Sequence, residues 1–237
     1  LPLIVDDFLS DIERRKGGLQ QATTPRKEED LPVLKSGIFN NKTTGAPITI
    51  LFENNNLRSN DYEKQRAHPR PGHADFVARE KFGGYEDYRG SGHFSGRFTV
   101  ALVAGGVIAK KLLNHIEIKS YIKEIGGETD LEKGIQKAID AKDSVGGIVE
   151  CRVNNLPTKL GEPFFNSVES LLAHAIFAIP AVRGIEFGTG FAAAKMFGKD
   201  HNDVIENKRG KTTTNHAGGV VGGITNGNEL VFRIAIK

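Results

Sequence analysis

The chain is poor in the residues that staple small secreted proteins or anchor membrane proteins. Only one of its 237 residues is a cysteine, Cys151, so an internal disulfide and a multi-cysteine metal site are both excluded. Such a lone thiol is usually a buried apolar side chain. No apolar run approaches the ~20 residues that cross a bilayer, and the first residues show no signal-peptide pattern. These absences predict a cytoplasmic protein with no membrane partner.

Charge of one sign is not concentrated in the chain. Lysine and arginine number 32 against 29 aspartate and glutamate residues, which gives a formal net charge of +3. Because the basic residues are scattered, the sequence does not demand a general nucleic-acid surface. Few aromatic residues alternate with lysine, as single-stranded nucleic-acid binding would require. RNA binding therefore remains only a minor alternative, and no nucleic-acid partner is expected.

Several familiar catalytic motifs are also missing. The sequence has no P-loop lysine, no nucleophile elbow and no G-x-G-x-x-G after a strand. A P-loop nucleotide hydrolase, an α/β-hydrolase and a Rossmann dehydrogenase are therefore disfavoured. The one pair of histidines with close spacing, His68 and His73 in "HPRPGH", is too small a ligand set for a metal. No metal site is predicted.

Glycine, in contrast, is abundant, with 28 residues and many doublets. The doublet Gly105-Gly106 interrupts an apolar helical stretch, which predicts that another part of the chain packs closely there. Helical and strand patterns are mixed without a βαβ rhythm, so an α+β fold is expected. The expected helices cover residues 5–16, 97–113, 131–142 and 168–179; the expected strands lie in 33–55, 145–157 and 230–236, and 60–76 is expected to be a proline-broken loop.

Basic residues and histidines gather around the glycines of the stretch "GGYEDYRGSGHFSGR", residues 83–97, and just before it. Arg70, Arg89 and Arg97 offer guanidinium forks that match phosphate and carboxylate geometry, which suits a polyanionic small ligand. The plainer interpretation is that each arginine pairs with a nearby acid; the candidates are Asp61, Asp75, Glu80, Glu86 and Asp87. His73, in a Pro-Gly-His-Ala-Asp turn, is either a structural histidine or a proton donor that titrates near neutral pH.

Longer motifs give a more specific indication. The segments "RPGHADF", "GGYEDYRGSGHFSGRFTVALVAGGVIAKKLL", "DSVGGIVE", "LGEPFF", "AVRGIEFGTGF" and "TNHAGGVVGGITNG" resemble, in order and setting, those of the chorismate synthases. The resemblance covers nearly the whole chain. It implies a β-α-β sandwich with buried central helices between sheet layers. It also implies a carbon–oxygen lyase that converts 5-enolpyruvylshikimate 3-phosphate to chorismate and phosphate with reduced FMN, at the last step of the shikimate pathway.

The resemblance also suggests roles for particular residues. His73 of "RPGH" matches the family histidine that helps to protonate the reduced flavin, and is the expected catalytic residue. Substrate anions are expected on Arg15, Arg70 and Arg97. Cofactor contacts are expected at His93, Phe94, Ser95, Pro180, Ala181, Gly222 and Lys237. One basic cleft is expected to bring together Arg15, Arg70, His73, His93, Ser95, Arg97 and Gly222.

Some positions depart from the family pattern. Many members have Arg-Ser-Ser where His93, Phe94 and Ser95 stand, and Asn-Ala where Pro180 and Ala181 stand. Gln21 replaces an arginine found in some members, which bears on any direct contact with NADP. The family's amino-terminal Gly-Glu-Ser-His-Gly segment would precede Leu1, and its Lys-Pro-Thr-Pro-Ser loop would begin at Lys237.

The expected organisation is a single chorismate synthase-like domain over 1–237, incomplete at both ends, with residues omitted internally between Gly126 and Asp130. The family is homotetrameric, so the resemblance implies a homotetramer. A second reading is a non-catalytic flavin- or polyanion-binding module, which would keep the arginines without turning over the substrate.

Overall fold

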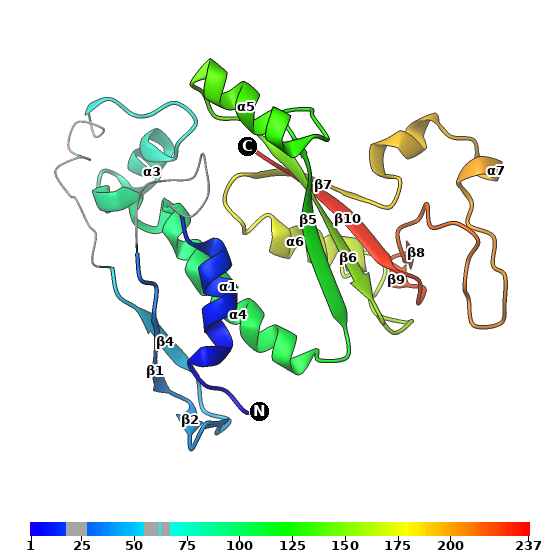
Figure 1. Cartoon of the computed structure of the whole chain (residues 1–237), viewed down its shortest axis with the longest axis horizontal. Coiled ribbons are helices and arrows are strands. Elements are labelled where there is room, and N and C mark those ends of the chain that lie inside the picture. The colour runs from blue at the N-terminus through cyan, green and yellow to red at the C-terminus, as the bar shows by residue number, and fades with distance from the viewer. Residues whose placement is uncertain (18–27, 55–61, 63–66) are drawn as a thin grey trace. The chain divides into compact units, whose positions relative to one another are not determined.

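A computed structural model describes residues 1–17, 28–54, 62 and 67–237 (Figure 1). Two positions named in the sequence analysis, Gln21 and Asp61, lie outside the described residues. The chain divides into two compact units, Leu1–Leu112 and Leu113–Lys237. The expectation of a single domain stays a prediction. Among the described residues, no helix is both long and apolar enough to cross a membrane.

The first unit combines helices with short antiparallel strands. Helix α1 has an apolar side, because Phe8 and Ile12 lie one turn apart and are both buried. The helix dipole favours its charges as well: Asp6 and Asp7 lie in the first turn, and Arg14 and Arg15 lie in the last. Strand β1 pairs with β4, and β2 with β3. The elements are α1 (Asp6–Arg15), β1 (Pro32–Ser36), β2 (Ile38–Phe39), β3 (Lys42–Thr43), β4 (Thr49–Phe52), α3 (Asp75–Phe82) and α4 (Thr99–Leu112).

Helices α1 and α4 pack against each other to form the core of this unit. Leu3, Phe8 and Ile12 are at most 1% exposed and meet Ala104 and Val107 of α4. Side chains from β1 and β4, including Leu34 and Ile50, pack against the same cluster. This core fixes the C-terminal end of α1, and therefore Arg15, next to the residues that precede α4.

Three expectations for this unit need correction. Residues 75 and 76, expected at the end of the proline-broken loop, instead begin helix α3. Helix α4, expected as a buried central helix, has exposed side chains, because Leu102 and Leu112 are 48% and 63% exposed. Gly105 and Gly106 face open space within the described part of the chain, so no close packing explains them.

The second unit is built on a four-stranded antiparallel sheet in the order β5-β6-β10-β7. Val153 of β6 and Leu230 and Phe232 of β10 point to one face, where Val168 and Ile176 of α6 cover them. Cys151 packs against this core, and burial raises the pKa of its thiol to about 11, as expected for a structural cysteine. The elements are β5 (Glu117–Ile125), α5 (Leu131–Ala141), β6 (Gly147–Asn154), α6 (Val168–Ile176), β7 (Val182–Phe187), α7 (Gly198–His201), β8 (Val220–Val221), β9 (Ile224–Thr225) and β10 (Leu230–Ile236).

The connection from β5 to α5 is a tight turn. Ile125 and Glu128 exchange two backbone hydrogen bonds of 3.0 and 2.9 Å, and the Asp130 side chain caps α5 by accepting from the Lys133 amide. An added Cβ on Gly134 would lie 2.4 Å from the carbonyl oxygen of Ile125, so glycine lets α5 approach β5 closely. The omission of residues expected between Gly126 and Asp130 stays a prediction, whereas the expected α+β fold is confirmed.

Candidate functional site

Three adjoining cavities in the first unit are each lined in part by residues from the stretch 86–98. The smallest, about 50 Å³, is bordered by His73 and Arg70. A second, about 380 Å³, is lined by Arg89, Gly92 and Phe98, and a third, about 350 Å³, by Arg15 and Lys16. Asp87 borders the first two, and Ser95 and Arg97 border the last two. The sequence-predicted residues of this unit therefore line one continuous region.

Arg15 and Arg97 meet on a single buried carboxylate. Asp30 is 2% exposed at its side chain and accepts from Arg15 Nη1 at 3.0 Å and from Arg97 Nη1 at 2.6 Å. Arg15 comes from the end of α1, and Arg97 from the turn before α4, so Asp30 joins two elements of the core. Arg15 and Arg97 therefore lie together, as expected. The carboxylate of Asp30 that joins them was not predicted from the sequence.

Further contacts hold both guanidinium groups in place. Arg15 Nε donates to Thr99 Oγ1 at 3.0 Å, and its Nη2 donates to the carbonyl oxygen of Arg97 at 3.1 Å. Arg97 Nη2 donates to the carbonyl oxygen of Glu53 at 2.8 Å. Burial lowers the pKa of Arg15, which Asp30 partly offsets and the nearby Arg97 charge reinforces. Because burial disfavours the charged form of Arg15, a bound anionic ligand would stabilise that charge.

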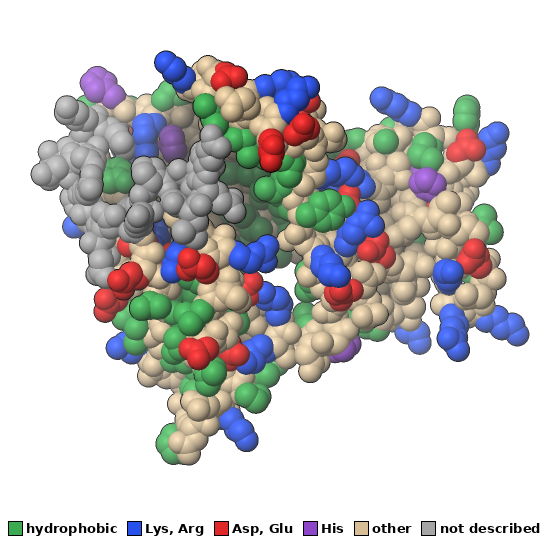
Figure 2. Space-filling view, viewed as in Figure 1, with side chains coloured by type: hydrophobic (Ala, Val, Ile, Leu, Met, Phe, Trp, Pro, Cys, Tyr) green, Lys and Arg blue, Asp and Glu red, His purple; other side chains and the backbone are tan. Residues whose placement is uncertain are grey.

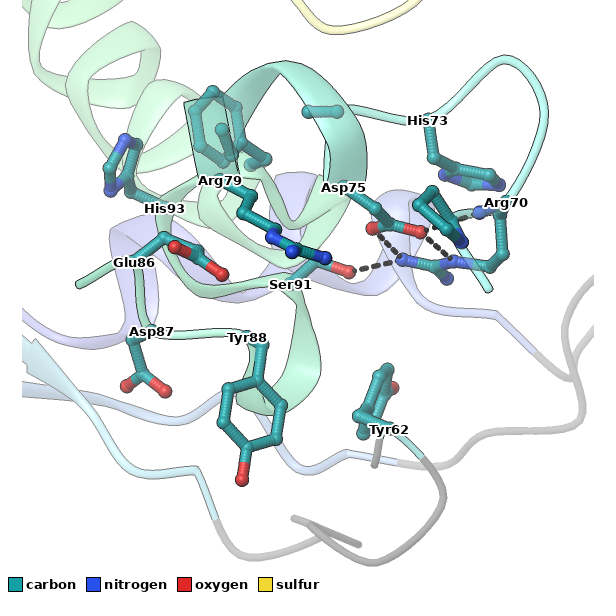
Figure 3. A pocket seen from close by; sticks show the side chains of 14 residues that line it. Tyr62, Arg70, His73, Asp75, Arg79, Glu86, Asp87, Tyr88, Ser91 and His93 are labelled. Atoms are coloured by element: carbon teal, nitrogen blue, oxygen red, sulfur yellow. Dashed lines mark hydrogen bonds and ion pairs between the residues drawn. The ribbon is translucent and has the colours of Figure 1, made fainter. Parts of the chain in front are cut away.

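Arg70 is anchored by a carboxylate as well, in agreement with the plainer interpretation of this arginine. Its Nε and Nη2 atoms donate to the two oxygens of Asp75, each at 2.8 Å, and Nη2 also donates to Ser91 Oγ at 2.9 Å (Figure 3). The hydrogen bonds from Arg70 hold the pKa of Asp75 at about 2. His73 lies in the turn between them, and its amide donates to the carbonyl oxygen of Arg70 at 3.3 Å.

The segment that carries His93, Phe94 and Ser95 has an unusual backbone. Gly90, Ser91 and Gly92 all have positive φ, and an added Cβ on Gly92 would lie 2.4 Å from the carbonyl oxygen of Asp87. The His93 ring packs edge-on against Phe82 at 5.5 Å and lies 4.3 Å from the Phe94 ring. Ser95 Oγ accepts from the Arg97 amide at 3.3 Å. His93 is thus held by aromatic neighbours, whereas an arginine would reach for anions.

The other predicted cofactor residues lie in the second unit, at two ends of its sheet. Lys237 and Ala181 meet at the Ile236 end of β10, where the Lys237 amide donates to the Ala181 carbonyl oxygen at 3.0 Å. Pro180 precedes Ala181 in the turn before β7. Gly222 lies instead in the β8–β9 hairpin, just after Gly218, whose carbonyl oxygen accepts from the Val231 amide at the Leu230 end of β10 at 3.0 Å. Convergence of these four residues with those of the first unit stays a prediction.

Sequence reasoning missed three residues of the region. Asp30 lies 15 and 67 positions from its two arginine partners, so no local pattern could reveal it. Lys16 borders the same cavity as Arg15, and its place after Arg15 in "ERRK" was an available signal. Ser91 stands between two glycines in "RGSG", where a side chain at positive φ is uncommon.

The residues present fit a flavin that carries a phosphate. Phe52, Phe98 and Val100 give the 380 Å³ cavity an aromatic and aliphatic wall, as a planar ring system requires. Arg89 and Arg97 border the same cavity with guanidinium groups, which match phosphate geometry. Gly92 lets the backbone lie close to this space without a side chain.

Fold and site together define a class: an α+β protein whose first unit carries arginine-lined cavities suited to an anionic ligand. The family model for chorismate synthase matches residues 1–237. A chorismate synthase of Chitinophaga pinensis is 68% identical over the whole of this chain and 71% of its own length. The enzyme of Thermococcus gammatolerans is 45% identical, over 98% of this chain and 73% of its own length.

A solved structure agrees with these sequence matches. A crystal structure of chorismate synthase superposes on all of this chain and on 77% of its own chain, with a TM-score of 0.79 and 26% identity. The chain belongs to the chorismate synthase family. Its activity is that of a lyase which converts 5-enolpyruvylshikimate 3-phosphate to chorismate and phosphate, at the last step of the shikimate pathway.

Proposed function

We propose that this chain carries out the reaction with reduced FMN and that the arginine-lined region of the first unit takes both the cofactor and the substrate. The observation that carries the proposal is the shared border at Ser95 and Arg97: an aromatic and apolar cavity adjoins an arginine-lined one. A planar ring system suits the first cavity, and a ligand with one phosphate and two carboxylates suits the second.

The arginines bind and orient the substrate. Arg15 and Arg97 are held at fixed positions by Asp30, so their remaining N–H groups are oriented before the ligand arrives, which reduces the entropy lost on binding. Arg70 contributes its Nη1 donor, since Nε and Nη2 donate to Asp75 and Ser91. The three guanidinium groups stabilise the negative charge of the departing phosphate.

The remaining residues serve the cofactor. When bound, reduced FMN supplies an electron transiently, with no net redox change. Ser95 borders the apolar cavity proposed for the flavin, and His93 and Phe94 border the smallest of the three cavities. We assign further cofactor contacts to these two residues and to Pro180, Ala181, Gly222 and Lys237. His73 holds an exchangeable proton on an imidazole nitrogen, and its exposed ring lies beside Arg70 (Figure 3). Family membership supports a homotetrameric assembly.

The direct test is chorismate formation by the full chain from 5-enolpyruvylshikimate 3-phosphate and photoreduced FMN under anaerobic conditions. We expect chorismate and inorganic phosphate in equal amounts, and no product without FMN. Binding of FMN without any turnover would instead identify a non-catalytic flavin-binding module. Light scattering of the same sample tests the homotetramer.

His73→Ala tests the role of the imidazole. Because a proton donor acts mainly in the transition state, we expect kcat to fall by roughly 100-fold or more while KM for the substrate changes little. His115→Ala is a matched control, since His115 lies outside the cavities described above. An equal loss in kcat and in substrate affinity would mark His73 as a binding residue.

A further inference from the structure

Arg70 is fixed from two directions by parts of the chain that lie on either side of helix α3. Asp75, the first residue of α3, takes Nε and Nη2 through its two carboxylate oxygens. Ser91, which follows α3 in the chain, accepts a further hydrogen bond from Nη2 through its hydroxyl oxygen at 2.9 Å. The guanidinium plane is therefore bound along one edge, and only Nη1 remains for a ligand, on the side of Tyr62 in Figure 3.

Ser91 holds its place at a conformational cost. Its φ is +68°, in the left-handed region that favours glycine, and it stands between two glycines with positive φ. Glycine would adopt this backbone without strain. A side chain at such a position persists where the surrounding structure requires it. Within the described part of the chain, the Ser91 hydroxyl takes part in one hydrogen bond, which it accepts from Arg70.

The contact joins the two segments that carry the proposed site. On one side, His73 lies between Arg70 and Asp75, in a turn closed by the Arg70 carbonyl oxygen. On the other side, Ser91 is two residues before His93, whose ring is held by Phe82 and Phe94. The described residues provide no other side-chain hydrogen bond between residues 70–75 and 89–95.

We propose that Ser91 is a positioning residue: its hydroxyl fixes the Arg70 guanidinium together with Asp75 and couples the turn of His73 to the segment of His93, Phe94 and Ser95. The inference rests on the proposed function, because Arg70 is assigned there as a substrate ligand. Ser91 acts through Arg70 and touches no substrate itself. Its loss leaves Arg70 free to turn about the Asp75 carboxylate, so the Nη1 donor no longer points in one direction.

Two substitutions separate the hydroxyl from the backbone strain. Ser91→Ala removes the hydroxyl and keeps the strain, whereas Ser91→Gly removes both. If strain alone mattered, Ser91→Gly would be at least as ordered and active as the natural chain. If the hydroxyl positions Arg70, both variants lose the coupling, although Ser91→Gly gains stability. Asn41→Gly is the matched control, because Asn41 also has positive φ, +62°, and lies in the β2–β3 turn of the same unit.

The experiment measures each variant without and with substrate. In the ligand-free chain, we expect amide hydrogen exchange of residues 70–76 and 89–95 to quicken several-fold in both Ser91 variants and to stay unchanged in Asn41→Gly. In turnover, we expect KM for 5-enolpyruvylshikimate 3-phosphate and the inhibition constant of inorganic phosphate to rise about 5- to 10-fold in both Ser91 variants. The thermal midpoint should fall in Ser91→Ala and not in Ser91→Gly.

Several outcomes would overturn the proposal. If Ser91→Gly keeps the exchange rates and the KM of the natural chain, the hydroxyl does not position Arg70. If exchange becomes faster while KM is unchanged, the coupling between the two segments does not affect ligand binding. A natural chain without turnover would refute the proposed function alone. In that case the amide exchange rates and the affinity for inorganic phosphate still test the role of Ser91. If both quantities are unchanged in both Ser91 variants, the positioning role is rejected.

Discussion

Asp30 is the residue on which both substrate arginines of the third cavity converge. Its carboxylate is almost fully buried between two guanidinium groups, and its backbone has φ of +51°. Asparagine tolerates this conformation and keeps the shape of the side chain, while it removes the charge. Asp30→Asn therefore isolates the effect of the negative charge on the two buried cations.

We expect Asp30→Asn to lower the free energy of unfolding by about 3 kcal/mol, since Arg15 loses its carboxylate partner and Arg97 keeps Glu28 at 3.7 Å but loses its shorter ion pair. Urea denaturation at pH 7 measures the loss. Asp11→Asn is the control and lies on the helix of Arg15, because Asp11 pairs with the exposed Lys110, and such pairs contribute about 1 kcal/mol or less. Equal effects of the two substitutions would show that Asp30 is no more than a surface partner.

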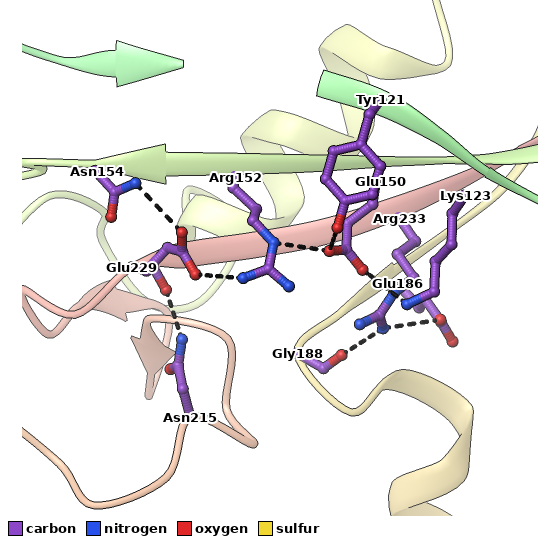
Figure 4. Close-up of polar contacts among 10 residues, drawn as sticks. All are labelled: Tyr121, Lys123, Glu150, Arg152, Asn154, Glu186, Gly188, Asn215, Glu229 and Arg233. Carbon is purple, nitrogen blue, oxygen red and sulfur yellow. Dashed lines mark hydrogen bonds and ion pairs between the residues drawn. The ribbon is translucent and has the colours of Figure 1, made fainter. Parts of the chain in front are cut away.

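At the scale of the elements, the sheet of the second unit has one face that is polar throughout its centre. Glu150 of β6 is completely buried there and accepts from Tyr121, from Lys123 at 3.0 Å, from Arg152 at 2.8 Å and from Arg233 at 2.6 Å (Figure 4). The four donors come from β5, β6 and β10, so one carboxylate ties three strands together. Figure 2 shows basic and acidic side chains intermingled over this sheet.

The protonation of Glu150 makes the stability of this sheet dependent on pH. Burial opposes its ionisation, but the four hydrogen bonds outweigh burial and lower the pKa to about 2, from 4.5. A lowered carboxyl pKa stabilises the fold above pH 4.5, and the contribution disappears as the pH falls from 4.5 towards 2. Glu150→Gln should therefore be less stable than the natural chain at pH 7, with a difference that shrinks below pH 4.5.

Chemical denaturation at pH 7, 4.5 and 3 measures this difference. Comparison with the natural chain at each pH removes the contributions of other groups, such as Asp75, that also have a low pKa. Glu117→Gln serves as the control, because Glu117 pairs with Lys119 on the exposed part of β5. A stability difference that stays constant from pH 7 to pH 3 would contradict the role given to Glu150.

The elements also show what the sequence could and could not predict. Helix α1 and strand β10 were predictable because their apolar residues recur at helical and strand spacing. Helix α3 was missed because Pro69, Pro71 and Gly72 precede it and because its apolar residues, Phe76 and Val77, are 58% and 59% exposed. Without a buried stripe, a helix leaves little trace in the hydrophobic pattern.

The candidate site shows the same division. Arg15, Arg70, His73 and Arg97 could be selected because they lie in long motifs that resemble a family. Their carboxylate partners were predictable only where they are close in sequence, as Asp75 is to Arg70. Asp30 lies just before β1 and is brought to Arg97 by the packing of β1 against the core of α1 and α4, and such a contact follows from tertiary structure alone.

At the scale of the whole molecule, each unit has a hydrophobic core of its own. Leu3, Phe8 and Ile12 belong to a cluster within the first unit, whereas Val153, Leu230 and Phe232 belong to one within the second. Asp30 and Glu150 are the buried carboxylates that tie the elements around each core. The two substitutions above therefore probe whether the chain opens as one cooperative domain or as two units.

Native-state hydrogen exchange of the full chain can distinguish these alternatives. We expect Asp30→Asn to quicken exchange in α1, β1 and α4 and to leave β6 and β10 protected, because its buried charges belong to the first core alone. Glu150→Gln should quicken exchange in β5, β6 and β10 and leave α1 and α4 as they were. Asp11→Asn and Glu117→Gln provide the matched baselines in each unit. If either substitution quickens exchange equally in both units, the two cores unfold together, and the chain is the single cooperative domain that its sequence predicts.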